Sequence, residues 1–495
     1  MRGGLQVCGA SSDAGKSFVV AGLCRLLARQ GIKVAPFKAQ NMANNACVTA
    51  DGAEIAQAQW VQALAAGAEP EAAMNPVLLK PTSERTSQVV VMGRPVGTWT
   101  AAGVQGEKAA LLPVVLNALA DLRGRFDVIL CEGAGSPTEI NLLDGDIVNL
   151  RVAREAGLPA VVVGDIDRGG VFAALYGTVA LLPDDLRACV RGFLVNKFRG
   201  DPALLGRAAA ELEKRCGVPT LGVIPMVPGA AIDAEDSLAI EFSALPPAEP
   251  RFDVVAVRFP CVANFGDLDP LRLEPGVAVR WVQRPDHLGR PNLVILLGSK
   301  ATRADCDWFR TTGLAAAVEA CGAPIVGVCA GLQMLGRTIA DPQGVEGPPG
   351  EQAGLGLLAV ETAFEPDKVL DRRTGWCLSG PGAGEAVAGY RIHHGRVSAA
   401  SPVEPWLVAG DGTVLGWRQG RVAGTTLHGL FEGDGFRAAT LRWAAEVGGA
   451  APPEGLGTVS FAEARLRRLD RIADTLAQSV DMDRLLALVA EGAPA

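Results

Sequence analysis

A glycine-rich turn near the start of the chain has the residue types of a phosphate-binding loop. It runs from Cys8 to Ser17 as CGASSDAGKS, between a short apolar run and a segment with helical apolar spacing. Backbone N–H groups in such a strand-to-helix turn converge on one spot, where Lys16 would meet terminal phosphate oxygens and Ser17 would ligate Mg²⁺. The usual G-x-x-x-x-G-K-[ST] pattern needs glycine at Ala10, whereas this chain has it one place earlier. We predict a variant nucleotide-binding loop, rather than a ligand-free turn, that uses Gly9, Gly15, Lys16 and Ser17.

A cysteine in the second half has the setting of a nucleophile. Cys329 stands in the turn GVCAG, between a strand-like and a helix-like apolar run. Small flanking residues relieve crowding at such a turn, and a helix N-terminus favours the thiolate. His428 follows another strand-like run, and a cysteine and a histidine on adjacent strand ends can act as nucleophile and base. We predict this pair as catalytic; a buried cysteine at a strand end is the alternative.

An oxyanion beside that cysteine needs two N–H donors. Ala330 directly follows the nucleophile, and Gly298 lies in the turn LGSK after a strand-like run. We expect these two residues to supply the donors. His393 and His394 either line a pocket or close a hairpin, and His287 has the surroundings of a surface loop.

Polar residues in the first half repeatedly follow strand-like runs. Lys38, Glu132, Asp165 and Asn196 each stand at the end of such a run. Because ligands bind at the carboxyl edge of parallel sheets, we expect them near one site. Lys38 would reach the phosphates, unless it is a solvated surface lysine. Glu132 would hold Mg²⁺ as a Walker-B-like acid, and Asn196 would contact the nucleotide.

An acid and an amide-rich loop lie between these strands. The loop QNMANN contains Asn41, Asn44 and Asn45, and Glu54 precedes an alanine-rich helix. An acid at a helix N-terminus is ordinarily a cap. In a nucleotide site it can also hold Mg²⁺, which prefers oxygen ligands, so we predict the metal ligands Ser17, Glu54 and Glu132.

Strands that alternate with helices must position these residues. Strand-like runs at 5–7, 32–37, 127–131, 160–164 and 192–195 alternate with helical spacing, which predicts a doubly wound parallel-sheet α/β domain over residues 1–245. The proline-rich segment 233–250 reads as a linker. A second α/β domain then covers 251–440, and a helical segment without assigned chemistry covers 441–495.

Composition restricts the class of partner. With 495 residues the chain is long enough for roughly two to four domains. The net charge of −8 argues against nucleic acid as a partner, and no apolar run is long enough to span a bilayer. The 11 cysteines show no metal-ligand spacing, and the start lacks a secretory signal. We therefore expect a cytoplasmic protein that acts on small molecules, of unknown oligomeric state.

The order of these motifs resembles that of the glutamine-dependent cobyric acid synthases, up to about residue 440. The first half is similar to the dethiobiotin-synthetase-like ATP-dependent amide ligases, through the GKS loop, Lys38, Glu54, EGAG at Glu132 and Asn196. The second half resembles the class I glutamine amidotransferases of the cobyrinate type, through GVCAG at Cys329 and LHG at His428. The segments DGAEI, EINL and DIDRGG stand between them in the same order.

The resemblance implies a reaction. It would be the ATP- and glutamine-dependent amidation of the b, d, e and g side-chain carboxylates of adenosylcobyrinic acid a,c-diamide, in cobalamin biosynthesis. ATP would activate each carboxylate as an acyl phosphate, and ammonia from glutamine would displace phosphate. The alternatives are cobyrinic acid a,c-diamide synthase and a P-loop scaffold ATPase with an inert amidotransferase-like domain.

The chain departs from the motifs of this family and its relatives in three motifs. Leu430 stands where many class I amidotransferases have a glutamate, so we expect His428 to lack a third partner, as in the cobyrinate type. Leu297 and Ala301 flank the GSK turn in place of the usual Pro and Asn, and Arg391 replaces a common Glu.

The corrinoid would lie in a broad groove above the carboxyl edge of the first sheet. Hydrogen bonds to it would come from loop residues, although such residues are more often loop caps. The candidates are Asn41, Asn44, Asn45, Glu139, Asn141, Asp165 and Asp167.

Overall fold

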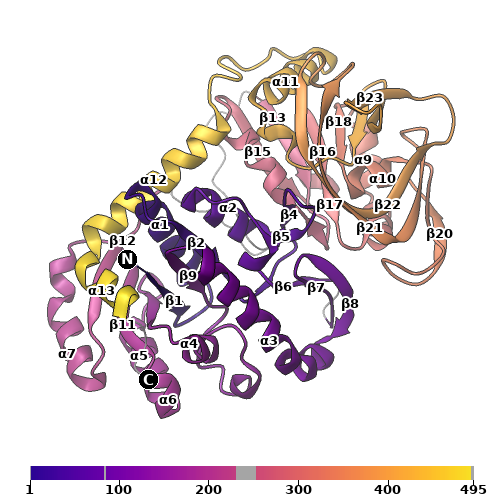
Figure 1. The fold of residues 1–495 in the computed structure, drawn as a ribbon. Helices are drawn as coiled ribbons and strands as arrows, with labels where there is room; N and C mark the ends of the chain where they lie inside the picture. Colours follow the sequence, from indigo (N-terminus) through magenta and orange to yellow (C-terminus); the bar gives the residue numbers. More distant parts are fainter. Residues whose placement is uncertain (1, 83–84, 230–251, 492–495) are drawn as a thin grey trace.

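The fold is built on two large β-sheets that belong to different halves of the chain (Figure 1). The computed structural model describes residues 2–82, 85–229 and 252–491. The expected linker at 233–250 lies outside the described residues.

The first sheet has six strands, all parallel. Its strands are near-continuous apolar runs because both of their faces are buried. Val128 and Leu130 pack with the first helix, whereas Ile129 and Cys131 pack on the opposite face. The predicted doubly wound parallel sheet is therefore confirmed, with all five predicted strands in it. In spatial order the strands are β12 (Thr220–Pro225), β11 (Val190–Phe198), β10 (Ala160–Asp165), β1 (Gly3–Gly9), β9 (Val128–Glu132) and β2 (Val34–Phe37).

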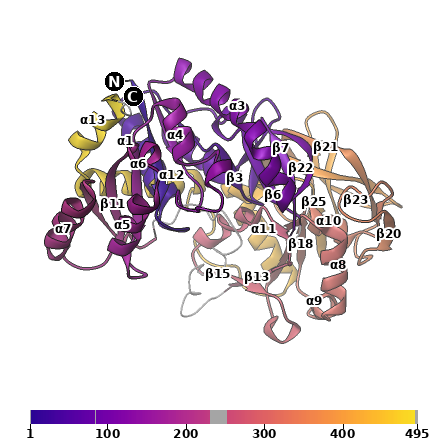
Figure 2. The same ribbon diagram turned by 90° about the horizontal axis from the view of Figure 1, so that it is seen from below.

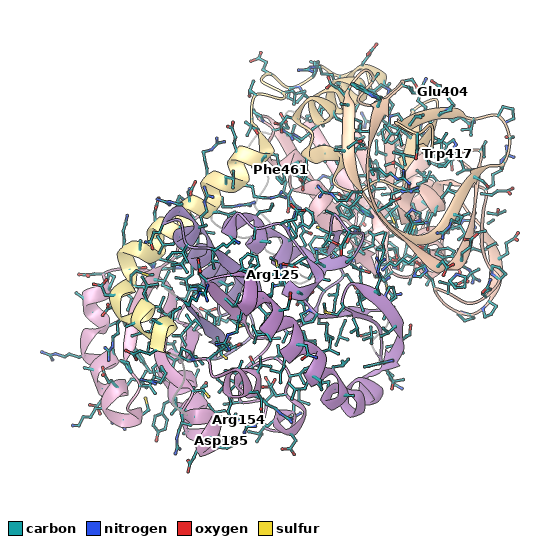
Figure 3. All side chains as sticks on the ribbon, in the orientation of Figure 1. Arg125, Arg154, Asp185, Glu404, Trp417 and Phe461 are labelled. Carbon is teal, nitrogen blue, oxygen red and sulfur yellow. The ribbon has the colours of Figure 1, made fainter. Side chains whose placement is uncertain are left out.

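Helices flank this sheet. They are α1 (Lys16–Arg29), α2 (Gln57–Ala66), α3 (Ala101–Arg125), α4 (Leu150–Ala156), α5 (Val171–Leu181), α6 (Asp184–Arg187) and α7 (Gly206–Cys216). In Figure 3, Arg154 of α4 and Asp185 of α6 lie together at the lower edge, where they form an ion pair.

Two small sheets that the sequence did not predict lie between β2 and α3. One is the hairpin β4 (Ala46–Val48) and β5 (Glu54–Ala56). The other has four strands, β3 (Gln40–Met42), β6 (Val77–Pro81), β7 (Thr86–Val91) and β8 (Arg94–Thr100). Strand β4 contacts the second half of the chain, and β6 and β7 lie beside its long strands in Figure 2.

The second sheet has 11 strands. Five of them form a parallel group, β15 (Val277–Val282), β13 (Phe252–Val257), β16 (Leu293–Leu296), β18 (Ile325–Val328) and β25 (Val422–Thr425). The sheet continues through β24 (Val414–Gln419), β23 (Glu404–Ala409), β21 (Val360–Cys377), β22 (Ala386–Ala399), β19 (Thr338–Asp341) and β20 (Gly350–Ala353). Trp417 and Glu404 in Figure 3 mark β24 and β23.

Short elements complete this second half. A two-stranded ladder joins β14 (Val262–Ala263) to β17 (Gly298–Ser299). The helices are α8 (Thr302–Thr311), α9 (Leu314–Ala320), α10 (Ala330–Leu335) and α11 (Asp434–Val447).

The last two helices return to the first half of the chain. The helix α12 (Phe461–Ser479) packs along α1, and α13 (Met482–Glu491) reaches β1, as the yellow ribbon in Figure 1 shows. Leu476 belongs to the apolar core of the first sheet, and Arg25 pairs with Asp470 at 2.8 Å. These helices therefore complete the first sheet's core instead of forming a unit of their own.

Among the helices of the described chain, none combines the length and apolar character needed to cross a membrane.

Candidate active sites

The glycine-rich loop joins β1 to α1, as its sequence predicts. Lys16 is the first residue of α1, and its Nζ donates to the carbonyl oxygen of Gly135 at 3.2 Å. A Cβ added at Gly9 would lie 2.8 Å from the carbonyl oxygen of Ser11, and one at Gly15 would lie 2.0 Å from Asn196 Nδ2. Both glycines are therefore needed for the close packing of this loop.

Glu132, at the end of β9, is the centre of the polar cluster below the loop. Its Oε1 accepts from Ser17 Oγ at 2.9 Å and from Lys38 Nζ at 2.8 Å. Its Oε2 accepts from Gln62 Nε2 at 2.5 Å. The structure thus brings together Lys38, Ser17 and Glu132, and it adds Gln62 of α2, which the sequence analysis missed. The only sequence signal for Gln62 is a polar residue in an alanine-rich helix.

Oxygen donors at this cluster suit Mg²⁺. The Ser17 hydroxyl and the Glu132 carboxylate are adjacent, and Mg²⁺ is commonly held by one or two protein oxygens together with waters and phosphate. Within the described residues, no group of three or more His, Cys, Asp or Glu side chains could hold a metal ion. A two-donor site of this kind does not need one.

Glu54 does not join that cluster. It is fully buried, and its two oxygens are taken by Lys80 at 2.5 Å and by Lys368 at 2.6 Å. Burial alone would raise the pKa of Glu54, but the two ammonium groups hold it well below its usual range. The reason for this placement is that Glu54 lies in the β4–β5 hairpin, which faces the second half of the chain. It is not a helix N-terminal acid beside the nucleotide.

Asn196 and the two aspartates lie on the other side of the loop. Asn196 Nδ2 donates to the carbonyl oxygen of Ala14 at 2.9 Å. Asp165 is buried and pairs with Lys197 at 2.8 Å, and Asp167 pairs with Arg199 at 2.8 Å.

Cys329 lies at the sharp turn between β18 and α10. Its φ of 55° and ψ of −110° are unusual for a residue other than glycine. Strained backbone of this kind occurs where a nucleophile is presented at a strand-to-helix turn. A Cβ at Gly331 would lie 2.0 Å from the carbonyl oxygen of Leu296, so the turn also packs tightly against β16.

His428 stands next to Cys329 because β18 and β25 are parallel neighbours, with Val328 opposite Thr425. Its Nδ1 bonds to Asp267 Oδ2 at 2.7 Å, and the Gly429 N–H donates to Asp267 Oδ1 at 2.7 Å. His428 therefore has a carboxylate partner, contrary to the expectation from Leu430. No spacing could reveal it, since Asp267 lies 161 residues upstream.

The charges in this triad favour the imidazolium. Burial opposes the charged ring, but Asp267 and Cys329 outweigh it and raise the pKa of His428 to about 10. With Nδ1 held by Asp267, the other ring nitrogen is left for Cys329. Such a pairing stabilises a thiolate–imidazolium pair, the reactive form of a cysteine nucleophile.

The turn after β16 shows that Gly298, one of the two expected oxyanion donors, does not point its N–H at Cys329. Lys300 N donates to the carbonyl oxygen of Cys261, and the register places Gly298 opposite Ala263. Since amides alternate in direction along an antiparallel strand, the N–H of Gly298 points to β14 and that of Ser299 points away from it. Gly298 instead allows close approach, because a Cβ there would lie 3.3 Å from His428 Cε1.

Cys329 and His428 line the same cavity. Its wall includes Lys80 of the first half and Lys300, Glu346 and Lys368 of the second. His393 and His394, on β22, also line this cavity, so of the two alternatives for them the structure supports the one in which they line a pocket.

A reciprocal pair of hydrogen bonds joins the amide-rich loop to the turn that carries Asp267. The Phe265 N–H donates to Asn45 Oδ1 at 3.1 Å, and the Ala46 N–H donates to Asn264 Oδ1 at 3.0 Å. Tyr390 stacks on His428 with 5.5 Å between ring centroids. The first half thus contacts the turn that carries Asp267, and its Cys47 Sγ lies 3.8 Å from the hydroxyl of Tyr390, whose ring covers His428.

Asn41 and Asn45 do not line an open groove. Both are buried, and Asn41 Nδ2 donates to Gln59 Oε1 at 2.9 Å. Their amides serve contacts inside the protein. Glu139 and Asn141 are exposed, and Asn44 is half-buried with an Oδ1 that has no hydrogen-bond partner in the structure.

Two family models match the two halves. Residues 5–238 match a CobQ/CobB/MinD/ParA nucleotide binding domain, and residues 253–436 match a CobB/CobQ-like glutamine amidotransferase domain. One solved glutamine amidotransferase aligns with 40% of this chain and 99% of its own, at 20% identity and a TM-score of 0.31.

Relatives align with the whole chain. Proteins described as cobyric acid synthase from Frankia casuarinae, Nocardia farcinica and Streptomyces avermitilis are 48%, 49% and 49% identical to it. Each alignment covers 100% of this chain and 98% of the relative.

Proposed function

This chain belongs to the cobyric acid synthase family, and from that premise we propose that it amidates the b, d, e and g side-chain carboxylates of adenosylcobyrinic acid a,c-diamide. It is a glutamine-dependent ligase of cobalamin biosynthesis with a nucleotide-binding domain and an amidotransferase domain. The observation that carries the proposal is a Cys329–His428–Asp267 triad and a phosphate-binding loop in one chain.

The second domain, 251–440, releases ammonia from glutamine. His428 accepts the thiol proton of Cys329, and the thiolate attacks the side-chain amide carbon. The amides of Ala330 and Ser299 stabilise the oxyanion. Ammonia leaves with the proton from His428, and water then hydrolyses the thioester to glutamate and free thiol. Asp267 holds the ring in the orientation that both proton transfers need.

The first domain, 1–245, activates the carboxylate. The loop from Gly9 to Ser17 binds the phosphates of ATP. Asn196, beside this loop, contacts the nucleotide. A carboxylate oxygen of the corrinoid attacks the terminal phosphorus, ADP leaves, and ammonia then displaces phosphate from the acyl phosphate. Lys16 and Lys38 stabilise the charge on the transferred group.

Ser17 and Glu132 are the residues that would hold Mg²⁺. The ion would neutralise charge on the phosphate oxygens. The ion pair between Lys38 and Glu132 would then be exchanged for contacts with nucleotide and metal. We place the reaction in the cytoplasm, because all 11 cysteines are free thiols, as expected in a reducing compartment.

A time course followed by mass spectrometry tests the substrate. The protein is incubated with ATP, glutamine and either cobyrinic acid or adenosylcobyrinic acid a,c-diamide. We expect four successive replacements of hydroxyl by amide on the diamide, with partly amidated products that appear and then disappear. Conversion of cobyrinic acid only as far as the a,c-diamide would contradict the proposal and indicate the shorter synthase.

A further inference from the structure

The cavity beside Cys329 contains one cation and one carboxylate that are not paired. Lys80 and Lys368 share the two oxygens of Glu54. Lys300, in contrast, forms no ion pair with any described carboxylate, and its Nζ reaches only Gln88 Oε1, at 3.4 Å. Glu346 accepts from the Thr302 N–H at 3.1 Å and forms no ion pair with a described side chain, and it acts on Lys300 only through space.

Leaving these charges unpaired is costly. Desolvation lowers the pKa of Lys300 and raises the pKa of Glu346, and the attraction between the two charges offsets this only in part. Two neutral groups in the same wall are also unsatisfied. Thr302 Oγ1 and His393 Nε2 are buried and have no hydrogen-bond partner in the structure. His393 Nδ1 lies 2.7 Å from the carbonyl oxygen of Gly395, which leaves Nε2 as an acceptor.

A separated cation and carboxylate in one cavity match the two charges of an amino acid. We infer that Lys300 binds the α-carboxylate of glutamine and that Glu346 binds its α-ammonium group, with the side-chain amide at Cys329. Thr302 Oγ1 and His393 Nε2 complete the hydrogen bonds of the same head group. This inference rests on the proposed glutaminase reaction and adds its substrate-binding residues.

The arrangement also explains why three lysines can line one small cavity. Glu54, from the first domain, neutralises Lys80 and Lys368 and leaves Lys300 as the cation that can receive a carboxylate. Glutamine recognition thus depends on a charge that the first domain supplies.

Binding without turnover gives the first test. In a Cys329→Ala background, isothermal titration with glutamine should show an affinity that falls roughly 10- to 100-fold on Lys300→Met or Glu346→Gln, the loss expected for a hydrogen bond between charged groups. Lys33→Met, at an exposed position of the first domain, is the matched control and should leave the affinity unchanged. Unchanged affinity in Lys300→Met would overturn the inference.

Truncated substrates give the second test, with Cys329 intact. 4-Aminobutanamide lacks the α-carboxylate and glutaramic acid lacks the α-ammonium group. In kcat/KM, Lys300→Met should lose the wild-type preference for glutamine over 4-aminobutanamide. Glu346→Gln should lose the preference for glutamine over glutaramic acid. Ammonia-driven amidation should stay at the wild-type rate and shows that the variants are folded. If the wild type hydrolyses glutamine and both variants keep both preferences, only this inference fails; a wild type without glutaminase activity would overturn the proposed function instead.

Discussion

Cys329 should be needed for glutamine and dispensable for ammonia. Cys329→Ala removes the attacking thiolate, so glutamine-driven amidation should fall to background. Amidation with added ammonium chloride should continue, because the ligase site is in the other domain. A glutamine-analogue electrophile should label the wild type at one cysteine. Peptide mapping provides the measurement, with Cys321→Ala as a control that keeps the label. Labelling at another cysteine would refute the assignment.

Asp267 should act on the rate through His428. Asp267→Asn keeps the size of the side chain but removes the charge that stabilises the imidazolium. We expect glutaminase kcat to fall on the order of 100-fold or more, with a smaller change in KM. Ammonia-driven amidation should be unaffected. Steady-state glutamate release measures this, and equal losses with glutamine and with ammonia would point to a general folding defect instead.

The same ion pair predicts a pH-dependent stability. The ordinary histidine pKa is 6.5, and that of His428 is raised to about 10, chiefly by Asp267 against the opposing effect of burial. The folded protein therefore holds this proton more tightly than the unfolded chain. Its contribution is complete below pH 6.5 and is lost as the pH rises through about 10. The gap in unfolding free energy between wild type and Asp267→Asn should shrink over that range in urea titrations; a gap that widens would contradict it.

At the scale of elements, the contact between α1 and α12 depends on a helical glycine. A Cβ at Gly22 would lie 2.5 Å from Leu476 Cδ1 and 2.7 Å from Ile472 Cγ2. Gly22→Ala should therefore destabilise the protein by about 1–3 kcal/mol, although alanine is the better helix former. Gly177, in α5, has no atom within 4 Å of an added Cβ. Gly177→Ala is the matched control and should stabilise by about 0.5–1 kcal/mol in denaturant unfolding. Stabilisation by both changes would disprove the close packing.

Sequence reasoning succeeded where a residue's neighbours in the chain determine its place. The strands of the first sheet, the loop at Lys16 and the turn at Cys329 are each specified by a local apolar run and its flanking glycines. Since parallel strands end at one edge, the meeting of Ser17 with Glu132 also followed. Periodicity is a local signal, and these are local features.

The failures have a common physical cause. Asp267 meets His428 within the second domain, and Glu54 meets Lys368 across the contact between the two domains, in both cases at separations that no repeat or spacing encodes. The small strands from β3 to β8 were missed because β3, β4 and β5 have only three residues each, and the mostly exposed β8 has no apolar run. The oxyanion role predicted for Gly298 was wrong because the direction of its N–H depends on strand register, which the sequence does not reveal.

At the scale of the whole molecule, the two domains should be coupled through Asn264. Its φ of 53° is left-handed, so Asn264→Gly preserves the backbone and removes the acceptor for the Ala46 N–H. We expect the turn that carries Asp267 to loosen and glutaminase activity to drop roughly tenfold, the effect of about one hydrogen bond. Ammonia-driven amidation is the internal control and should change little. Glutaminase activity at the wild-type level would show that this joint does not position the triad.

The return of α12 to α1 has a consequence for synthesis on the ribosome. The apolar strip of α1 is translated first, and its partner in α12 follows more than 400 residues later. At 5–20 residues per second, roughly 20 to 90 s pass between the two. During that interval the second domain can already fold, while the nascent first domain still exposes the surface that Leu469 and Leu476 will cover. The domain that is made first is thus completed last, and a chaperone that shields an emerging apolar helix would act on α1.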